Sequence, residues 1–536
     1  MFVKSSKTIW RRSVFGLLML VLLISMTVSG CGSTAATPPP PKPAATETKK
    51  LSVLRYAMHR DAIGIDPHIS SAGTMNVLQA NVYDKLVEFD PEGRIVGELA
   101  ERWEIPDPTT YVFYLRKGVK FHNGNPLTAD DVKCSFDRIM DPKTGAADTP
   151  YLTCVKDIKV VDDYTIRFTL SAPNATFLST LTSNAAGIID KEWFDKSNDP
   201  KKVSNGTGPF MLKGFEPQVK YELVKNPNYW KKDKDYVDQL TLIPIQDDNA
   251  RVNALLKGEV DFAEYIPWQM MDTLAKDPKF VVTKGYDNFN IVRLNTNRPP
   301  LNNPKVCQAL NYVIDRTAIS KIAWGGQANP MSELLMPEGH WAFNKDIKGV
   351  WKTDHVKARQ LLKEAGYSSP DKLHLVFHSS DLVVHIDTAQ VIENQLSAFG
   401  IKVDFKVIDS PTLLDKRKTG DYMLMMDGLS NSMPDPDTYY RYFHSTGGAG
   451  QAIAVKYKIP QLDALLEKGQ TLTDQAQRQK VYAEAEKILI ANPPWIFGVW
   501  RPQAEAYYTY VKGYVPLCSG LRMRSPGFME TVRIEK

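Results

Sequence analysis

Residues 99–139 read LAERWEIPDPTTYVFYLRKGVKFHNGNPLTADDVKCSFDRI, and this stretch decides the fold class of the chain. From Tyr111 to Leu115 the side chains alternate with a two-residue period, which predicts a β-strand, and prolines before it and glycines after it mark its ends. Thr128 stands at a helix N-cap position, and two aspartates follow in the first turn, where the helix dipole favours anions. Apolar residues then recur at helical spacing, namely Val132, Phe136 and Ile139. The pattern predicts a strand–turn–helix unit of an α/β protein, which by itself indicates no function.

The amino-acid sequence of the same stretch also resembles that of a known protein family. LAERWE, YVFYLRKGVKFHNG and LTADDVKCSF closely resemble the signature of the bacterial extracytoplasmic solute-binding proteins of family 5, which bind peptides and nickel for ABC importers. Further matching segments are NGTGPF (205–210), NPNYW (226–230), RVNALLKGEVDF (251–262), VCQALNYVIDRTAI (306–319) and ARQLLKEAGY (358–367). The resemblance implies a two-lobed α/β fold of the periplasmic-binding-protein type (class II, large cluster C), with an extra inserted α/β domain and a ligand cleft between the lobes.

The length of 536 residues predicts two or three domains, because a single hydrophobic core rarely grows this large. Strand and helix patterns, read with the resemblance, divide the globular part into a discontinuous lobe I, an inserted domain and a lobe II. Lobe I takes 51–83, 179–295 and 500–536, the inserted domain takes 84–178, and lobe II takes 296–499. Two crossings between lobes, near 295–300 and 493–500, predict a hinge that closes around a ligand.

The N-terminus predicts location. A basic start is followed by the apolar run 14–28, which has the proportions of a secretory signal. The run ends in VSGC, which resembles a bacterial lipobox, so residues 1–31 are expected to be a lipoprotein signal with the lipid on Cys31. The alternatives are a plain secretory signal with a chance cysteine, or an uncleaved anchor helix. Residues 32–50 are rich in proline and predict a disordered tether. We expect a lipid-anchored protein outside the cytoplasm, in the periplasm or on the outer face of the cytoplasmic membrane.

Composition and motifs narrow the function classes. A hydrophobic share of 43% and a charged share of 24% are typical of globular domains, and a net charge of +5 without a basic stripe argues against nucleic acid as a partner. HExxH, GxSxG and kinase motifs are absent, so we predict no catalytic residues and no cofactor. After Cys31 no zinc-type cysteine spacing occurs. Cys134 and Cys154 either form a disulfide or remain free thiols.

Aromatic and polar residues near the predicted lobe junctions are candidate ligand contacts. Flat rings can grip ligands of varied shape, although tryptophans are also ordinary core residues. By the resemblance, the loop 70–76 faces the ligand and the loop at His378 borders the cleft. His374, His378 and His385 could instead bind a metal, but we predict surface or core histidines and no metal site. The candidates from these arguments are Trp268, Trp324, Trp500, Asn297, Thr74 and His378.

The segment 428–437, GLSNSMPDPD, departs from the family pattern. In peptide binders of the family, an acid here pairs with the α-ammonium group of the peptide, because a buried charge without a partner is costly. In this chain that position falls on Ser432, whereas Asp435 matches a later acid that could simply form a turn. Asp427 could supply a replacement charge. Peptides with a free amine therefore become less favoured, and modified peptides, sugars or other small solutes more so.

Together these observations predict a substrate-binding protein rather than an enzyme. We expect a monomer that captures a peptide or related small solute between two lobes and delivers it to the permease subunits of an ABC importer. Two other functions stay open: a sensor or peptide chaperone on the same fold, and a secreted hydrolase. A hydrolase would need a nucleophile and a base that converge in the cleft.

Overall fold

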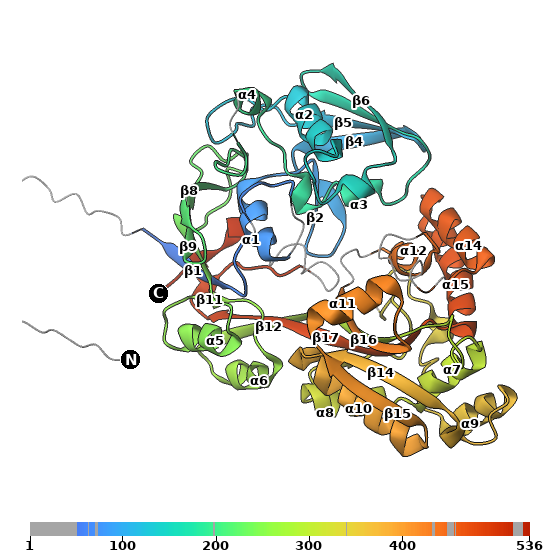
Figure 1. The fold of residues 1–536 in the computed structure, drawn as a ribbon. Helices are drawn as coiled ribbons and strands as arrows, with labels where there is room; N and C mark the ends of the chain where they lie inside the picture. The colour runs from blue at the N-terminus through green and yellow to red at the C-terminus, as the bar shows by residue number, and fades with distance from the viewer. Residues whose placement is uncertain are drawn as a thin grey trace, which may run out of the picture. The chain divides into compact units, whose positions relative to one another are not determined.

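The computed structural model describes residues 51–536 apart from 63, 70–72, 197–198, 339, 431–434, 447–454, 456 and 518–528. The chain divides into a first unit, 1–50, and a second unit, 51–536, and the second is compact. The predicted signal, lipidation site Cys31 and tether fall in the first unit and lie outside the described residues. All elements below belong to the second unit (Figure 1).

The stretch 99–139 folds as its pattern predicts. β5 (Thr110–Leu115) is a central strand of an antiparallel sheet of four strands in the order β4-β5-β7-β6, with β4 at Ala100–Asp107, β6 at Val155–Asp162 and β7 at Thr165–Leu170. α2 (Ala129–Met140) follows, and Thr128 caps it: the Thr128 amide and hydroxyl both donate to Asp131 Oδ2, at 2.7 and 2.9 Å. The apolar face of α2 packs with the sheet in one hydrophobic cluster that includes Phe113, Phe136 and Phe168.

The principal sheet has eleven strands and runs through most of the second unit (Figure 1). Its order is β15-β14-β16-β12-β17-β11-β1-β10-β9-β8, and β13 pairs with β17 off this path. The strands are β1 (Val53–Met58), β8 (Phe210–Glu216), β9 (Lys220–Lys225), β10 (Gln239–Pro244), β11 (Phe262–Ala263), β12 (Phe280–Leu294), β13 (Asn329–Pro330), β14 (His374–Ser380), β15 (Lys402–Ile408), β16 (Leu424–Ser430) and β17 (Trp495–Tyr508). β12 and β17 are the two longest and lie at its centre.

β12 and β17 join the two halves of this sheet. The first part of β12 pairs with the last part of β17, from Phe280 opposite Tyr508 to Gly285 opposite Gln503. After a register shift between Gly285 and Asn288, β12 pairs with the first part of β17 on one edge and with β16 on the other. β12 includes 289–294, and nine residues precede this part in the strand. The extra residues include glycine, aspartate and asparagine, which are weak strand formers, and pairing with the distant β17 holds them extended.

Helices cover both halves of the sheet. Their bounds are α1 (Gly73–Val82), α3 (Phe177–Thr180), α4 (Lys191–Asp195), α5 (Asp248–Leu256), α6 (Trp268–Lys276), α7 (Pro304–Val313), α8 (Arg316–Trp324), α9 (His355–Glu364), α10 (Val383–Phe399), α11 (Ser410–Thr419), α12 (Thr438–Phe443), α14 (Pro460–Thr471) and α15 (Gln475–Ala491). Short strands complete the fold: β2 (Val87–Phe89), β3 (Ile95–Gly97), β18 (Val511–Lys512) and β19 (Arg533–Ile534). α10 ends at Gly400, whose φ of 108° suits a residue without a side chain.

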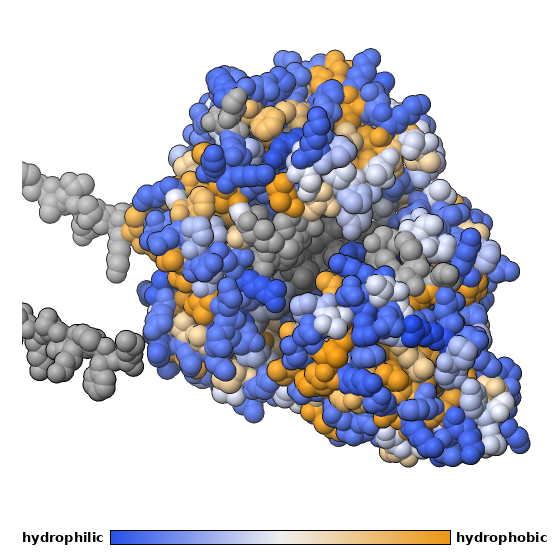
Figure 2. All heavy atoms as spheres, in the orientation of Figure 1, coloured by the Kyte–Doolittle hydropathy of each residue, from blue (hydrophilic) through white to orange (hydrophobic). Residues whose placement is uncertain are grey.

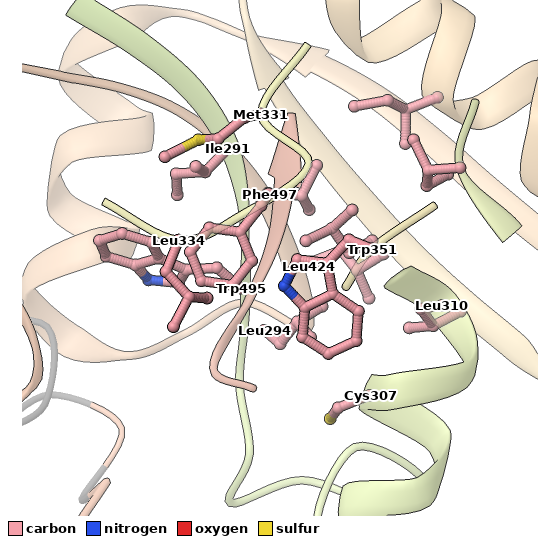
Figure 3. Close-up of a cluster of buried hydrophobic side chains, with 14 of the residues drawn as sticks. Ile291, Leu294, Cys307, Leu310, Met331, Leu334, Trp351, Leu424, Trp495 and Phe497 are labelled. Carbon is pink, nitrogen blue, oxygen red and sulfur yellow. The ribbon is translucent and has the colours of Figure 1, made fainter. Parts of the chain in front are cut away.

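The largest hydrophobic core lies where β12, β16 and β17 meet α7 and α8. In Figure 3, Trp351, Trp495 and Phe497 gather with aliphatic side chains from these elements. Trp495 and Phe497 are fully buried, so these two rings are core residues. Cys307 is buried in the same cluster, and Cys134, Cys154 and Cys307 are all free thiols. The disulfide left open between Cys134 and Cys154 is therefore not formed.

Candidate ligand-binding site

The second unit is hollowed on the face shown in Figure 2, in the region bounded by α3, α11 and α12. α11 follows β15 and precedes β16, so one wall of this hollow belongs to the end of the sheet beyond β12. β12 and β17 change register between Gly285 and Asn288, and polar residues of β12, β17 and α10 meet just beyond this shift, over Gly428 of β16.

Three polar side chains converge over Gly428 on β16. A Cβ atom added to Gly428 would lie 2.5 Å from His385 Nε2, 3.4 Å from Arg501 Nη2 and 3.5 Å from Asn290 Oδ1. Asn290 comes from β12, Arg501 from β17 and His385 from the first turn of α10. Because Gly428 has no side chain, the imidazole of His385, the guanidinium of Arg501 and the amide of Asn290 can meet in this space.

Arg501 carries the charge at this convergence. The residue is partly exposed as a whole, but its Nε atom is sealed from solvent and has no hydrogen-bond partner. Burial lowers the pKa of Arg501, opposed by the fields of Tyr265 and Asp427. A desolvated guanidinium normally has a paired carboxylate, and none of the described residues forms an ion pair with this one.

His385 and Asn290 are held by a hydrogen-bond network. Ser380 Oγ and His385 Nδ1 are 2.7 Å apart, and burial, assisted by the charge of Arg501, lowers the pKa of His385 to about 4. The imidazole is therefore neutral at pH 7. Asn290 Nδ2 donates to Val384 O at 2.8 Å and to Thr388 Oγ1 at 3.1 Å, whereas Asn290 Oδ1 is buried without a partner.

The predicted tryptophans surround this network. Trp324 Nε1 donates to Thr388 Oγ1 at 3.0 Å, so one hydroxyl joins Trp324 to Asn290. Trp500 lies directly opposite Phe289 in the sheet, with the two rings edge to face at 5.1 Å. Trp268 packs against the turn after Trp324, where a Cβ on Gly325 would lie 2.5 Å from its ring. Trp324 and Trp500 are almost fully buried, so their rings pack inside the protein.

Asp427 is next to Gly428, but its charge is already paired. Its Oδ2 accepts from Arg293 Nε at 2.5 Å and from Arg417 Nη1 at 3.4 Å. Despite burial, these arginines hold the pKa of Asp427 below its usual value. Any use of Asp427 as counter-ion for a ligand ammonium would have to be shared with Arg293.

The other predicted site residues lie elsewhere. Asn297 is exposed in the turn after β12. Asp435 forms a two-pronged ion pair with Arg478 of α15, at 2.6 and 2.7 Å, and accepts the amide of Asp437, as a turn former would. His378 is almost buried within β14, opposite Met425 of β16. The side chain of Thr74, at the start of α1, and the whole of Ser432 are outside the described residues.

No group of three or more potential ligands that could hold a metal ion occurs among the described residues. His374 is exposed at the start of β14, and His385 contacts Ser380, so the three histidines considered for a metal do not form one cluster. No helix in the described part of the chain combines the length and the apolar character that crossing a membrane requires.

Sequence reasoning missed Arg501, Asn290 and Gly428 as a group. Arg501 directly follows Trp500, and Gly428 directly follows Asp427. Two of the three residues are therefore chain neighbours of predicted candidates. Asn290 lies within a predicted strand, where period-2 alternation gives no functional signal. Their convergence depends on the pairing of β12 with both β16 and β17, which no local pattern contains.

Known proteins resemble the chain along most of its length. Heme-binding protein A of Haemophilus influenzae is 28% identical over 530 residues, which cover 91% of this chain and 96% of that protein. A probable di/tripeptide-binding protein 5 of Pseudomonas aeruginosa is 30% identical over 475 residues, 82% of this chain and 89% of the relative.

Solved structures agree. The PBP AgaA in complex with agropinic acid, from A. tumefaciens R10, has a TM-score of 0.77 and 28% identity, over 90% of this chain and 99% of that one. The ABC transporter-associated periplasmic binding protein DppA of Helicobacter pylori, in complex with peptide STSA, has a TM-score of 0.74 and 28% identity, over 90% and 98%. These similarities confirm the predicted two-lobed α/β fold.

The match to the family described as "Bacterial extracellular solute-binding proteins, family 5 Middle" spans residues 94–451. It includes the stretch 99–139 and both strands, β12 and β16, that carry Asn290 and Gly428. With more than half of its length inside this match, the chain belongs to the bacterial extracellular solute-binding proteins of family 5, the solute-capturing components of ABC importers.

Proposed function

We propose that this chain captures a peptide or a related small solute between its two lobes by hinge closure and hands it to the permease of an ABC importer. The observation that carries the proposal is the register shift in β12 and β17 between Gly285 and Asn288, with Asn290 and Arg501 just beyond it. Irregularities of this kind bend and twist a strand pair, so they suit a hinge. We place the hinge here, within the long strands, and keep the division into lobe I, inserted domain and lobe II as part of the proposal.

The ligand would contact the convergence over Gly428 directly, with Trp324 and Trp500 as supporting rings. The remaining proposed contacts from the sequence are Trp268, Asp427, Asn297, Asp435, His378, Thr74 and Ser432, of which Asp427 directly precedes Gly428 in the chain. We further propose a monomer that acts without catalysis, because capture and delivery need differential affinity for open and closed forms and no bond change.

Peptides are the ligand class to test first, since two of the relatives named above are a di/tripeptide-binding protein and a structure bound to a peptide. We expect a member of a di- and tripeptide panel to bind with a dissociation constant of about a micromolar, which corresponds to ~8 kcal/mol. Calorimetry on residues 51–536 would measure the affinity, and small-angle X-ray scattering would measure closure as a smaller radius of gyration. Binding with an unchanged radius would contradict the hinge, and steady release of cleaved peptide would contradict the absence of catalysis.

The lipid anchor has its own test. We expect the full-length chain, expressed in a bacterium, to separate with the membrane fraction, and Cys31→Ser to abolish both the lipid mass on the mature N-terminus and detergent-phase partitioning. One acyl-bearing cysteine with a flexible leash would hold the body near its permease. Cys154→Ser, which changes a half-buried free thiol of the body, is the matched control and should behave as the parent chain. A Cys31→Ser protein that still enters the detergent phase would favour an uncleaved anchor helix.

A further inference from the structure

We propose that Arg501 is the anion-recognition residue of the ligand site, and that the solute is therefore a free acid. The carboxylate of the solute would lie against the Arg501 guanidinium, and an N–H or O–H next to that carboxylate would donate to Asn290 Oδ1. This inference rests on the proposed function, since it names the chemistry of the ligand that the cleft would hold.

Among the described residues, no carboxylate is paired with the charge of Arg501. Its Nε has neither solvent nor an acceptor, and no described residue pairs with the guanidinium. The acid whose field acts on Arg501 is Asp427, and Arg293 and Arg417 already pair with Asp427. The residues of 51–536 outside the described part include no aspartate or glutamate at all. Within the described residues no carboxylate is paired with this cation, and a carboxylate ligand would supply the missing partner.

The neighbouring groups point to the same chemistry. Because Asn290 Nδ2 has two acceptors, Val384 O and Thr388 Oγ1, the amide orientation is determined and Oδ1 must face the convergence over Gly428. A buried carbonyl oxygen without a donor is costly, so it calls for a ligand N–H or O–H. A guanidinium beside an amide oxygen matches a carboxylate whose adjacent atom bears a donor, as at the C-terminus of a peptide.

The first turn of α10 adds a further positive potential. α10 has seventeen residues, and its N-cap is Leu382, which offers no side-chain acceptor to the first amides. His385, in this turn, is neutral at pH 7 and so adds no second charge that would demand a second anion. Leu382 and Val383 are exposed apolar residues at the same helix start, 48% and 62% exposed. The chemistry that fits is one carboxylate with an apolar group attached.

The experiment compares matched acid and amide pairs. The probes are Ala-Ala, Ala-Phe and Ala-Ala-Ala, each with a free C-terminal carboxylate and as the C-terminal amide, titrated into residues 51–536 by calorimetry. We expect the wild-type chain to bind at least one acid about 10- to 100-fold more tightly than its amide, the effect of one charge-assisted hydrogen-bonding group. Arg501→Gln should remove this preference, with amide affinity near that of the wild type.

Two further variants separate recognition from folding. Arg501→Lys keeps the charge but loses the planar fork, so it should restore part of the preference. Arg102→Gln, which removes an exposed arginine paired with Glu104 on β4, is the matched control and should keep the wild-type preference. The melting temperature of the ligand-free Arg501→Gln chain should equal or exceed that of the wild type, because an uncompensated charge is removed.

The outcomes separate the inference from the proposed function. Equal binding of acid and amide by the wild type, or an intact acid preference in Arg501→Gln, would overturn the role of Arg501 while leaving solute capture standing. A fall in melting temperature of ligand-free Arg501→Gln with no change in acid preference would assign Arg501 to folding. Failure of every acid and every amide to bind would overturn the peptide part of the proposed function and the inference with it.

Discussion

Replacing Asp427 with alanine is expected to lower the free energy of unfolding by about 3–5 kcal/mol. Arg293 is 1% exposed and its Nε donates to Asp427 Oδ2 at 2.5 Å, while Arg293 Nη1 has no hydrogen-bond partner among the described residues. Without Asp427 the guanidinium would be a buried cation with no counter-ion. Urea unfolding of residues 51–536 at neutral pH would measure the loss.

A matched control lies on the edge strand β15. Asp404 pairs with Lys406 at 3.0 Å, but both are exposed, so Asp404→Ala should cost less than about 1 kcal/mol. The double variant Arg293→Met, Asp427→Leu should recover much of the loss, since it removes both charges together. If Asp427→Ala lowered the free energy of unfolding no more than Asp404→Ala does, the Arg293–Asp427 ion pair would not be a determinant of stability.

The second large effect is a dependence of stability on pH caused by Glu486. Its carboxylate lies in the core of the second unit, 1% exposed, and accepts from Tyr439 Oη at 2.6 Å and Asn344 Nδ2 at 2.9 Å. Burial raises the pKa of Glu486 to about 7, although these two donors oppose the shift. The folded chain therefore binds this proton more tightly than the unfolded chain, and stability must fall as pH rises through 7.

We expect Glu486→Gln to reduce that fall. Between about pH 5.5 and about pH 8 the wild-type chain should lose about 2 kcal/mol more than Glu486→Gln, given 1.36 kcal/mol for each pKa unit. Chemical unfolding at several pH values would measure both slopes. Glu484→Gln, on the exposed side of the same helix α15, is the control and should keep the wild-type slope. Parallel slopes for wild type and Glu486→Gln would show that Glu486 is already ionised in the folded chain at low pH.

Local patterns predicted most elements of the fold correctly. The strand and capped helix of 99–139 correspond to β5 and α2, because each pattern buries one face and satisfies its own ends. Helix α10 likewise ends at Gly400, a residue type that adopts the left-handed conformation found at helix C-termini. The length of β12 depends on the tertiary structure, because its first residues are extended by pairing with β17 rather than by their own preference.

The candidate site was only partly predictable. The tryptophans near the junctions stay predicted ligand contacts, and one of them, Trp324, is linked to Asn290 through the hydroxyl of Thr388. The sequence could not indicate that Asp427 would be paired with Arg293 whereas Arg501 would be left without a carboxylate. Arg293 and Arg501 both lie within strands, so their local sequences look alike. The register of β12 against β16 and β17 places Arg293 beside an acid and leaves Arg501 without one.

By itself, the sequence determined the family, the α/β class and most helices and strands, because these depend on short-range spacing, caps and turns that each segment carries within itself. The tertiary structure alone decided where the polar groups of β12, β16, β17 and α10 meet, and which charges remain uncompensated there. The physical reason is that hydrogen bonding between strands far apart in the chain sets which side chains become neighbours, and electrostatic compensation follows from that neighbourhood.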